Sequence, residues 1–180
     1  LGKRPNLVRR VPASDPRRRL EELLREIRTR GVVVCDLFGQ PVFRARKEGG
    51  VWKAERGAKK SHHLFLLDRA WKHIVREGYA IVVEGYADAL AMHASGFENT
   101  VAMMGLYLSQ KQLYLLLRFT REIIVLVDPG AVFRFPPTEI AFRGCWAELP
   151  QDPDEMILSG CVDELRRRIE ECRQNARTFA

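Results

Sequence analysis

The sequence lacks several signatures that would assign a function directly. None of its four cysteines stands in a CxxC pair, which excludes a zinc knuckle and argues against a disulfide framework. We therefore expect reduced, buried thiols, as in a cytoplasmic protein. No apolar run reaches the ~18 residues that a membrane helix needs, and the chain start has no signal-peptide core, so no membrane partner is expected. A P-loop, a dinucleotide-binding glycine motif and a nucleophile elbow are also absent.

Charge is divided unevenly along the 180 residues. Residues 1–76 hold 20 Lys/Arg and 8 Asp/Glu, whereas residues 77–180 hold 10 and 15. The basic half indicates a polyanionic partner, because phosphates attract Lys/Arg clusters through counterion release; an ordinary basic surface is the alternative. The length suits one domain with a small appendage. The chain begins at Leu1 rather than at a methionine, so we expect a fragment or a processed chain.

Periodicity divides the first half into two parts. Residues 1–30 read as a basic arm followed by a helix, capped by Ser14 or Asp15, with one apolar stripe at i, i+3, i+4 and i+7. Residues 31–78 read as a small basic α+β subdomain. Within it we expect strands over 32–38 and 41–46, a loop over 47–60 and a helix over 64–76.

The second half alternates strands with helices. The strands are predicted over 80–83, 99–104 and 122–127, with helices over 87–95 and 109–119 between them. This order implies a mainly parallel, Rossmann-like sheet over residues 79–160. After Asp128 the expected helix is missing, and we expect a strand over 139–147, an acidic turn over 152–155 and a final helix within 161–180.

Acidic residues follow the strands of this predicted sheet. Glu84 and Asp128 each come directly after a buried strand, Asp88 falls in the next helix, and Asp152 and Asp154 lie in the acidic turn. Because ligands bind beyond the carboxyl ends of parallel strands, these side chains can converge. Clustered carboxylates suit divalent-metal phosphoryl transfer. For any one of them alone, a helix cap or a turn residue is the simpler interpretation.

Two motifs resemble those of a known family. VEGYADAL at 83–90 and LPQDPDE at 149–155 are similar to the VEGYxDxxxL and DPDE segments of the TOPRIM domain in bacterial replicative primases of the DnaG type. LVDPGA at 126–131 also fits, and Lys60 followed by LFLL at 64–67 resembles a stretch of that family's basic subdomain. The resemblance covers about residues 31–170.

The resemblance implies a TOPRIM fold and a DNA primase, a nucleotidyltransferase that joins ribonucleoside triphosphates into short RNA primers on single-stranded DNA with Mg²⁺ or Mn²⁺. It gives Glu84 an acid/base catalytic role and makes Asp88, Asp128, Asp152 and Asp154 metal-binding. A replicative helicase is an implied partner. Basic residues would hold template or nucleotide phosphates: Lys59, Lys60, Arg44, Arg46, Lys53 and Arg56.

Two departures keep other functions open. The family's Asp-x-Asp reads Asp128-Pro129-Gly130 here, so one carboxylate is missing, and the helix that usually follows is shortened or lost. The family's zinc-binding module and helicase-contacting domain are not in this chain. The alternatives are a non-catalytic nucleic-acid-binding accessory module on a degenerate TOPRIM fold, and a metal-dependent TOPRIM nuclease.

Overall fold

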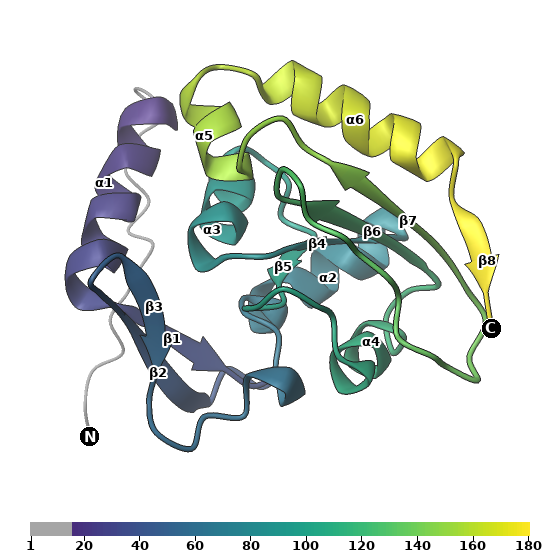
Figure 1. The fold of residues 1–180 in the computed structure, drawn as a ribbon, viewed down its shortest axis with the longest axis horizontal. Helices are drawn as coiled ribbons and strands as arrows, with labels where there is room; N and C mark the ends of the chain where they lie inside the picture. The colour runs from purple at the N-terminus through teal and green to yellow at the C-terminus, as the bar shows by residue number, and fades with distance from the viewer. Residues whose placement is uncertain (1–15) are drawn as a thin grey trace.

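The computed structural model describes residues 16–180, which form two sheets with helices around them (Figure 1). The predicted arm and the capping residues Ser14 and Asp15 lie outside the described residues. A small antiparallel sheet has the order β1-β2-β3, and a larger sheet has the order β5-β4-β6-β7-β8. No helix between residues 16 and 180 is long and apolar enough to cross a lipid bilayer.

The first sheet packs against helix α1 (Pro16–Arg30). It comprises β1 (Val32–Cys35), β2 (Pro41–Glu48) and β3 (Val51–Ala54). Phe43 and Ala45 of β2 point inward, so the strand's alternation leaves Arg44 and Arg46 exposed on the other face. The predicted 47–60 loop is wrong in part, because Gly49 and Gly50, both at positive φ, turn the chain back into β3.

The larger sheet is parallel in its centre. Strands β4 (Ala80–Val83), β5 (Thr100–Ala102) and β6 (Glu122–Val127) run parallel, as does β7 (Phe142–Glu148) beside β6. A short strand that the sequence did not indicate, β8 (Arg177–Phe179), closes the edge antiparallel to β7. The prediction of a mainly parallel sheet is confirmed.

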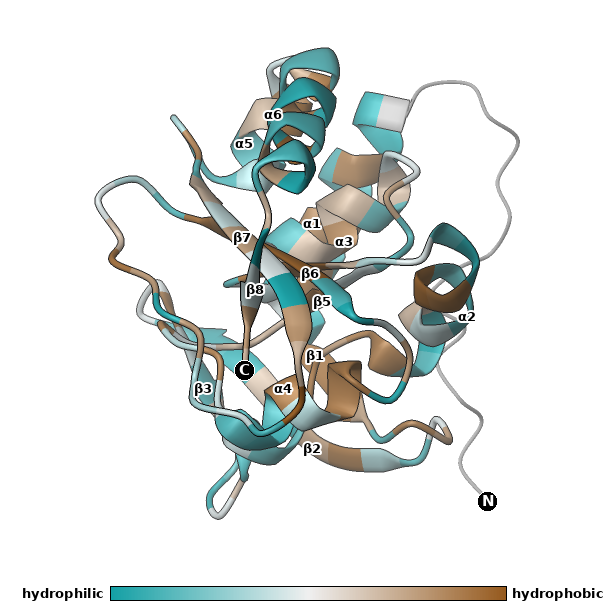
Figure 2. Ribbon diagram, turned by 90° about the vertical axis from the view of Figure 1, so that its right-hand side faces the viewer, coloured by the Kyte–Doolittle hydropathy of each residue, from teal (hydrophilic) through white to brown (hydrophobic). Residues whose placement is uncertain are grey.

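Two apolar cores lie on opposite faces of this sheet. Ile81 and Val83 face α1, α3 (Tyr86–Ala94), α5 (Pro153–Leu158) and α6 (Val162–Gln174). Ala80 and Val82 face α2 (Leu67–Glu77) and α4 (Gln110–Leu116). Strand residues buried on both sides explain the unbroken apolar runs in the sequence. Figure 2 shows the contrast between these apolar strands and the hydrophilic outer helix α6.

Two local predictions need correction. Helix α2 begins at Leu67 rather than at residue 64. Phe65 forms an antiparallel bridge with Ala102, the last residue of β5, and Leu66 takes a positive φ of 67°, so neither residue is helical. The acidic turn continues into helix α5. The missing helix after Asp128 is confirmed, since residues 128–141 form a turn and irregular chain but no helix.

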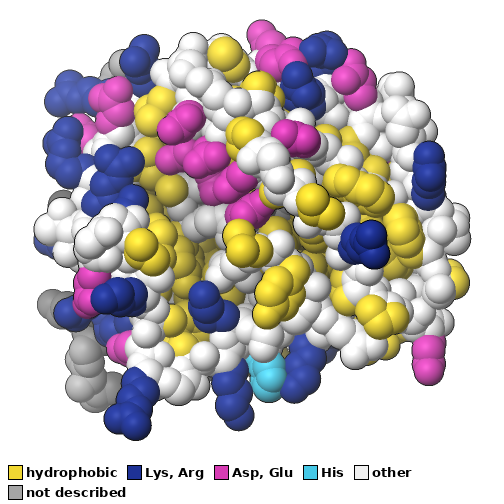
Figure 3. Space-filling model, in the orientation of Figure 1, with side chains coloured by type: hydrophobic (Ala, Val, Ile, Leu, Met, Phe, Trp, Pro, Cys, Tyr) yellow, Lys and Arg dark blue, Asp and Glu magenta, His cyan; other side chains and the backbone are white. Residues whose placement is uncertain are grey.

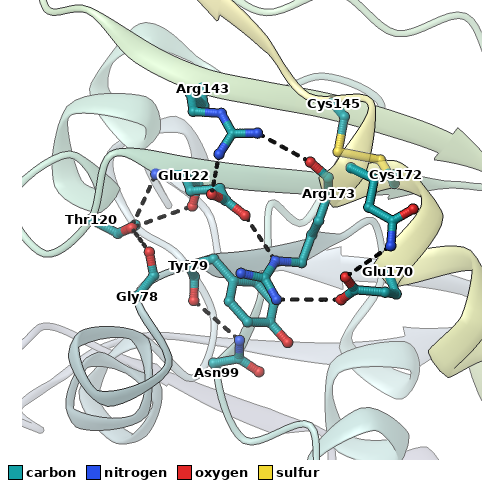
Figure 4. A network of polar contacts seen from close by, with 11 residues as sticks. Gly78, Tyr79, Asn99, Thr120, Glu122, Arg143, Cys145, Glu170, Cys172 and Arg173 are labelled. Atoms are coloured by element: carbon teal, nitrogen blue, oxygen red, sulfur yellow. Dashed lines mark hydrogen bonds and ion pairs between the residues drawn. A yellow bond between two sulfur atoms is a disulfide. The ribbon is translucent and has the colours of Figure 1, made fainter.

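The expectation of four reduced thiols is wrong for one pair. Cys145 of β7 and Cys172 of α6 form a disulfide, with Cα atoms 5.8 Å apart, while Cys161 is an exposed free thiol. The pairing arises because α6 packs back over β7, which sequence spacing did not reveal. Beside it, Glu122 binds both Arg143 and Arg173 (Figure 4).

Candidate metal and nucleic-acid site

Two of the predicted site residues lie next to each other at the carboxyl edge of the large sheet. Glu84 follows β4 and Asp128 follows β6, and these strands are neighbours. The backbone N–H of Asp128 donates to Oε1 of Glu84 at 3.1 Å. Glu84 is only 9% exposed, so this hydrogen bond fixes its carboxylate beside the end of β6.

Asp88 joins this edge from the first turn of α3. Its Oδ2 accepts a hydrogen bond from the backbone N–H of Gly85 at 3.0 Å, and its Oδ1 lies 3.5 Å from the backbone N of Asp154. Gly85 has no side chain to obstruct this approach: an added Cβ would lie 2.6 Å from Oδ2 of Asp88. A buried carboxylate therefore links α3 to the segment that carries Asp154.

Asp152 and Asp154 reach the site through the short helix α5. Asp152 precedes the first helical residue, Pro153, whose missing N–H and fixed φ suit that position. Helix α5 packs against α3, which brings its first turn to Asp88. The structure thus brings together the five acidic residues predicted from the sequence.

The electrostatics of this group show how close the carboxylates are. Burial, followed by the charges of Asp154, Asp128 and Asp152, raises the pKa of Asp88 to about 8. Burial, followed by Glu84, Asp152 and Asp154, raises the pKa of Asp128 to about 6. Burial also raises the pKa of Asp154. Each charge disfavours the others, and a cation between them would relieve that cost.

The carboxylates are spread apart, so they suit a divalent cation that keeps part of its water shell. Within residues 16–180, no three His, Cys, Asp or Glu side chains already form a compact metal-binding group. Mg²⁺ demands oxygen ligands but usually keeps several waters, so spread carboxylates in a partly hydrated edge are chemically suitable. Figure 3 shows acidic side chains gathered above a hollow that apolar side chains line.

The predicted basic residues lie in two regions, the hairpin of β2 and β3 with the turn that follows it, and the segment at η1. Arg44, Arg46 and Lys53 are exposed on β2 and β3, where Arg46 stands directly opposite Lys53. Lys53 also pairs with Glu48, whose Oε2 lies 3.2 Å from its Nζ, so Glu48 partly offsets the positive charge of this hairpin. Arg56 is exposed in the turn after β3, while Lys59 and Lys60 are at the short helix η1 (Lys60–His62), which packs against α4.

Other residues near the site were missed at the sequence level. Arg28 of α1 lies close enough to Asp154 for its charge to lower the pKa of that carboxyl, opposing the effect of burial. Trp52 of β3 meets Tyr86 of α3 with ring centroids 5.0 Å apart, which joins the small sheet to the site. The backbone N–H of Gly130 donates to Oε1 of Glu148 at 2.8 Å. None of these contacts has a local sequence signal, because each joins separate elements.

Comparisons with known proteins agree with this geometry. A sequence model of the Toprim domain matches residues 78–131. A DNA primase of Aquifex aeolicus is 35% identical over 120 residues, covering 62% of this chain and 24% of the primase. The structure of the Aquifex aeolicus primase zinc-binding and RNA polymerase domains superposes with a TM-score of 0.64 and 27% identity, over 83% of this chain and 40% of that one.

A structure of the DnaG primase catalytic domain bound to single-stranded DNA has the same fold. Its TM-score is 0.63 at 19% identity, over 77% of this chain and 51% of that chain. This chain thus spans about half or less of the length of the primase chains that it matches. The match over residues 78–131, the carboxylates at the sheet edge and the shared architecture agree with one another. Residues 78–131 therefore match the Toprim domain, in a chain whose fold is similar to that of DnaG-type primases.

Proposed function

We propose that this chain is a DnaG-like primase catalytic core that synthesises short RNA primers on single-stranded DNA. The observation that carries the proposal is the convergence of Glu84, Asp88, Asp128, Asp152 and Asp154 at one sheet edge, in a chain with a separate basic sheet. Ribonucleoside triphosphates would be the substrates, and a replicative helicase is a proposed partner. The cytoplasm is the proposed location.

The acidic group would hold Mg²⁺ or Mn²⁺, which would neutralise charge on the transferring phosphate. Asp88, Asp128, Asp152 and Asp154 are the proposed ligands. Burial and, after it, mutual repulsion raise the pKa of Asp88 and Asp128, which supports this role because a bound cation would favour the charged form of both carboxyls. The backbone amides of Gly85 and Asp154 hold Asp88 in place without adding positive side chains.

Glu84 is the proposed acid/base residue. Its Oε1 accepts the hydrogen bond from Asp128 N–H, and among residues 16–180 its Oε2 has no hydrogen-bond partner. That oxygen could accept the proton of a primer 3′-hydroxyl as its oxygen attacks the α-phosphorus and pyrophosphate leaves. Arg44, Arg46, Lys53, Arg56, Lys59 and Lys60 would bind template or nucleotide phosphates, because all six are exposed cations.

The test is primer synthesis by Glu84→Gln. The amide oxygen of Gln can keep the hydrogen bond to Asp128 N–H, so the variant should fold normally and bind DNA, but synthesise no primers. Glu155→Gln is the matched control, since it removes the same charge from an exposed position beside Asp154. Unchanged synthesis by Glu84→Gln would overturn the catalytic assignment.

The same assay separates the alternatives. Metal-dependent shortening of the DNA would indicate a TOPRIM nuclease. DNA binding that needs no metal, with neither primer nor cleavage, would indicate a non-catalytic accessory module. The replacement of a second aspartate by Gly130 motivates that module, since losing one carboxylate lowers metal affinity.

A further inference from the structure

Three lysines and a histidine lie around η1 and the start of α4. Lys111 of α4 places Nζ 2.7 Å from Nε2 of His62, so the ammonium donates to an unprotonated ring nitrogen. Lys59 and Lys60 precede His62 along the chain, with Ser61 between Lys60 and the histidine. Partial burial, then the charges of Lys111 and Lys59, lower the pKa of His62. No carboxylate among the described residues forms an ion pair with any of these four.

A buried amide holds this group together. The Nε2 atom of Gln112 donates to the carbonyl oxygens of Lys60, His63 and Met103, at 3.1, 2.8 and 2.9 Å. Gln112 is 1% exposed, and its Oε1 accepts from the backbone N–H of Ser109. These bonds tie the η1 backbone to α4 and to the end of β5. The cations are therefore held near one another by groups that do not neutralise them.

The group lies at the same sheet edge as the carboxylates. Met103 and Met104 directly follow β5, and their backbone N–H groups donate to the carbonyls of Val83 and Glu84 at 3.0 and 2.9 Å. Gln112 bonds to the carbonyl of that same Met103. Figure 3 shows a histidine among Lys and Arg side chains at the lower border of the face whose upper part carries the acidic side chains.

We propose that His62 and Lys111 extend Lys59 and Lys60 into a phosphate-binding subsite at this edge. The identity of the ligand rests on the proposed function: it is a phosphate group of either the DNA backbone or a nucleotide. A phosphate oxygen can accept from Lys111 Nζ and, once the ring is protonated, from His62 Nε2. An anion there would replace repulsion between the cations by attraction, which no carboxylate of the described chain does.

The experiment measures binding and needs no catalysis. A short, labelled, mixed-sequence single-stranded DNA is titrated by fluorescence anisotropy in EDTA at several NaCl concentrations, and a fluorescent ribonucleoside triphosphate is titrated with Mg²⁺. His62→Ala and Lys111→Ala are compared with Arg118→Ala, which removes a charge from an exposed position near the other end of the same helical segment. If the phosphate belongs to DNA, Lys111→Ala should flatten the log–log salt dependence by about 0.7 and weaken binding about three- to fivefold, and His62→Ala should weaken binding with little change in that salt dependence.

If the phosphate belongs to the nucleotide, DNA binding should stay unchanged and the nucleotide dissociation constant should rise about three- to fivefold. Lys111→Glu should weaken binding of the same ligand more than Lys111→Ala does. It should keep or raise the melting temperature of the protein, because the new carboxylate pairs with the remaining cations. Unchanged binding of both ligands, or an equal loss in Arg118→Ala, would overturn the subsite. Wild-type binding without primer synthesis would instead overturn only the proposed function.

Discussion

Replacing Asp128 by Asn should stabilise the metal-free protein. The Asp128 carboxylate is partly buried at the end of β6, where Glu84, Asp152 and Asp154 surround it with like charge. Asn has nearly the same shape but no charge, so the change removes repulsion while the backbone N–H at position 128 still donates to Glu84. If Asp128 binds a metal as proposed, its carboxylate is expected to cost stability when no metal is present.

The magnitude follows from the raised pKa. Folding raises the pKa of Asp128 from 3.8 to about 6, so the folded protein holds this proton more tightly than the unfolded chain does. The resulting penalty is absent well below pH 3.8, grows between pH 3.8 and 6, and is complete above pH 6. Unscreened, it amounts to about 3 kcal/mol. Because the group is partly exposed, solvent screening reduces the expected gain to about 1 kcal/mol.

Urea unfolding in EDTA at pH 8 measures this gain, and repeating it towards pH 4 should show the gain fading. Adding MgCl₂ should then stabilise the wild type more than Asp128→Asn, because binding to the folded state adds RT ln(1 + [L]/Kd). Asp163→Asn is the control, since Asp163 is exposed on α6. A loss of stability in metal-free Asp128→Asn at pH 8 would refute the reasoning, as it would mean that the carboxylate stabilises the fold.

Three further changes test the fold around the site. Replacing Cys145 and Cys172 by Ser should lower the free energy of unfolding by about 3 to 4 kcal/mol, given the sequence separation of 27 that the bond closes. Urea unfolding measures this, and an unchanged midpoint would contradict the pairing. Gln112→Leu removes a side-chain donor from three carbonyls, of which that of Lys60 still accepts from the backbone N–H of His63, and should cost about 2 to 4 kcal/mol in thermal unfolding, with a smaller loss contradicting its anchoring role. Gly144→Ala places a Cβ 2.7 Å from the Phe135 ring and should cost about 1 to 3 kcal/mol by the same assay, unless the ring can move aside.

The parallel sheet was predictable because its signals are local. The runs AIVV and EIIVLV are apolar on both faces, and Ser109 carries the sequence pattern of a helix N-cap. The structure confirms that cap: Ser109 Oγ accepts from Gln112 N–H, and Gln112 Oε1 accepts from Ser109 N–H. β3 and β8 were missed because each is short and depends on pairing with a strand that sequence pattern alone does not align.

The carboxylates were predictable for a topological reason. In a parallel sheet every strand ends at the same edge, so acids that follow strands converge regardless of their separation in sequence. Glu84 and Asp128, 44 residues apart, meet through one hydrogen bond for this reason. Asp88 and Asp154 meet because α3 packs against α5, a contact that the sequence suggested only through the family resemblance.

The cationic group could not have been found in the same way. The sequence pattern of His62-His63 suggested neither metal binding nor catalysis, and Lys111 was an exposed residue of an ordinary helix. Their 2.7 Å contact depends on Gln112, whose Oε1 caps its own helix while its Nε2 binds the η1 segment. One amide thus serves the local and the tertiary structure at once, and only the local role leaves a pattern in the sequence. A site that is built from such a tertiary contact becomes visible only when the fold is known.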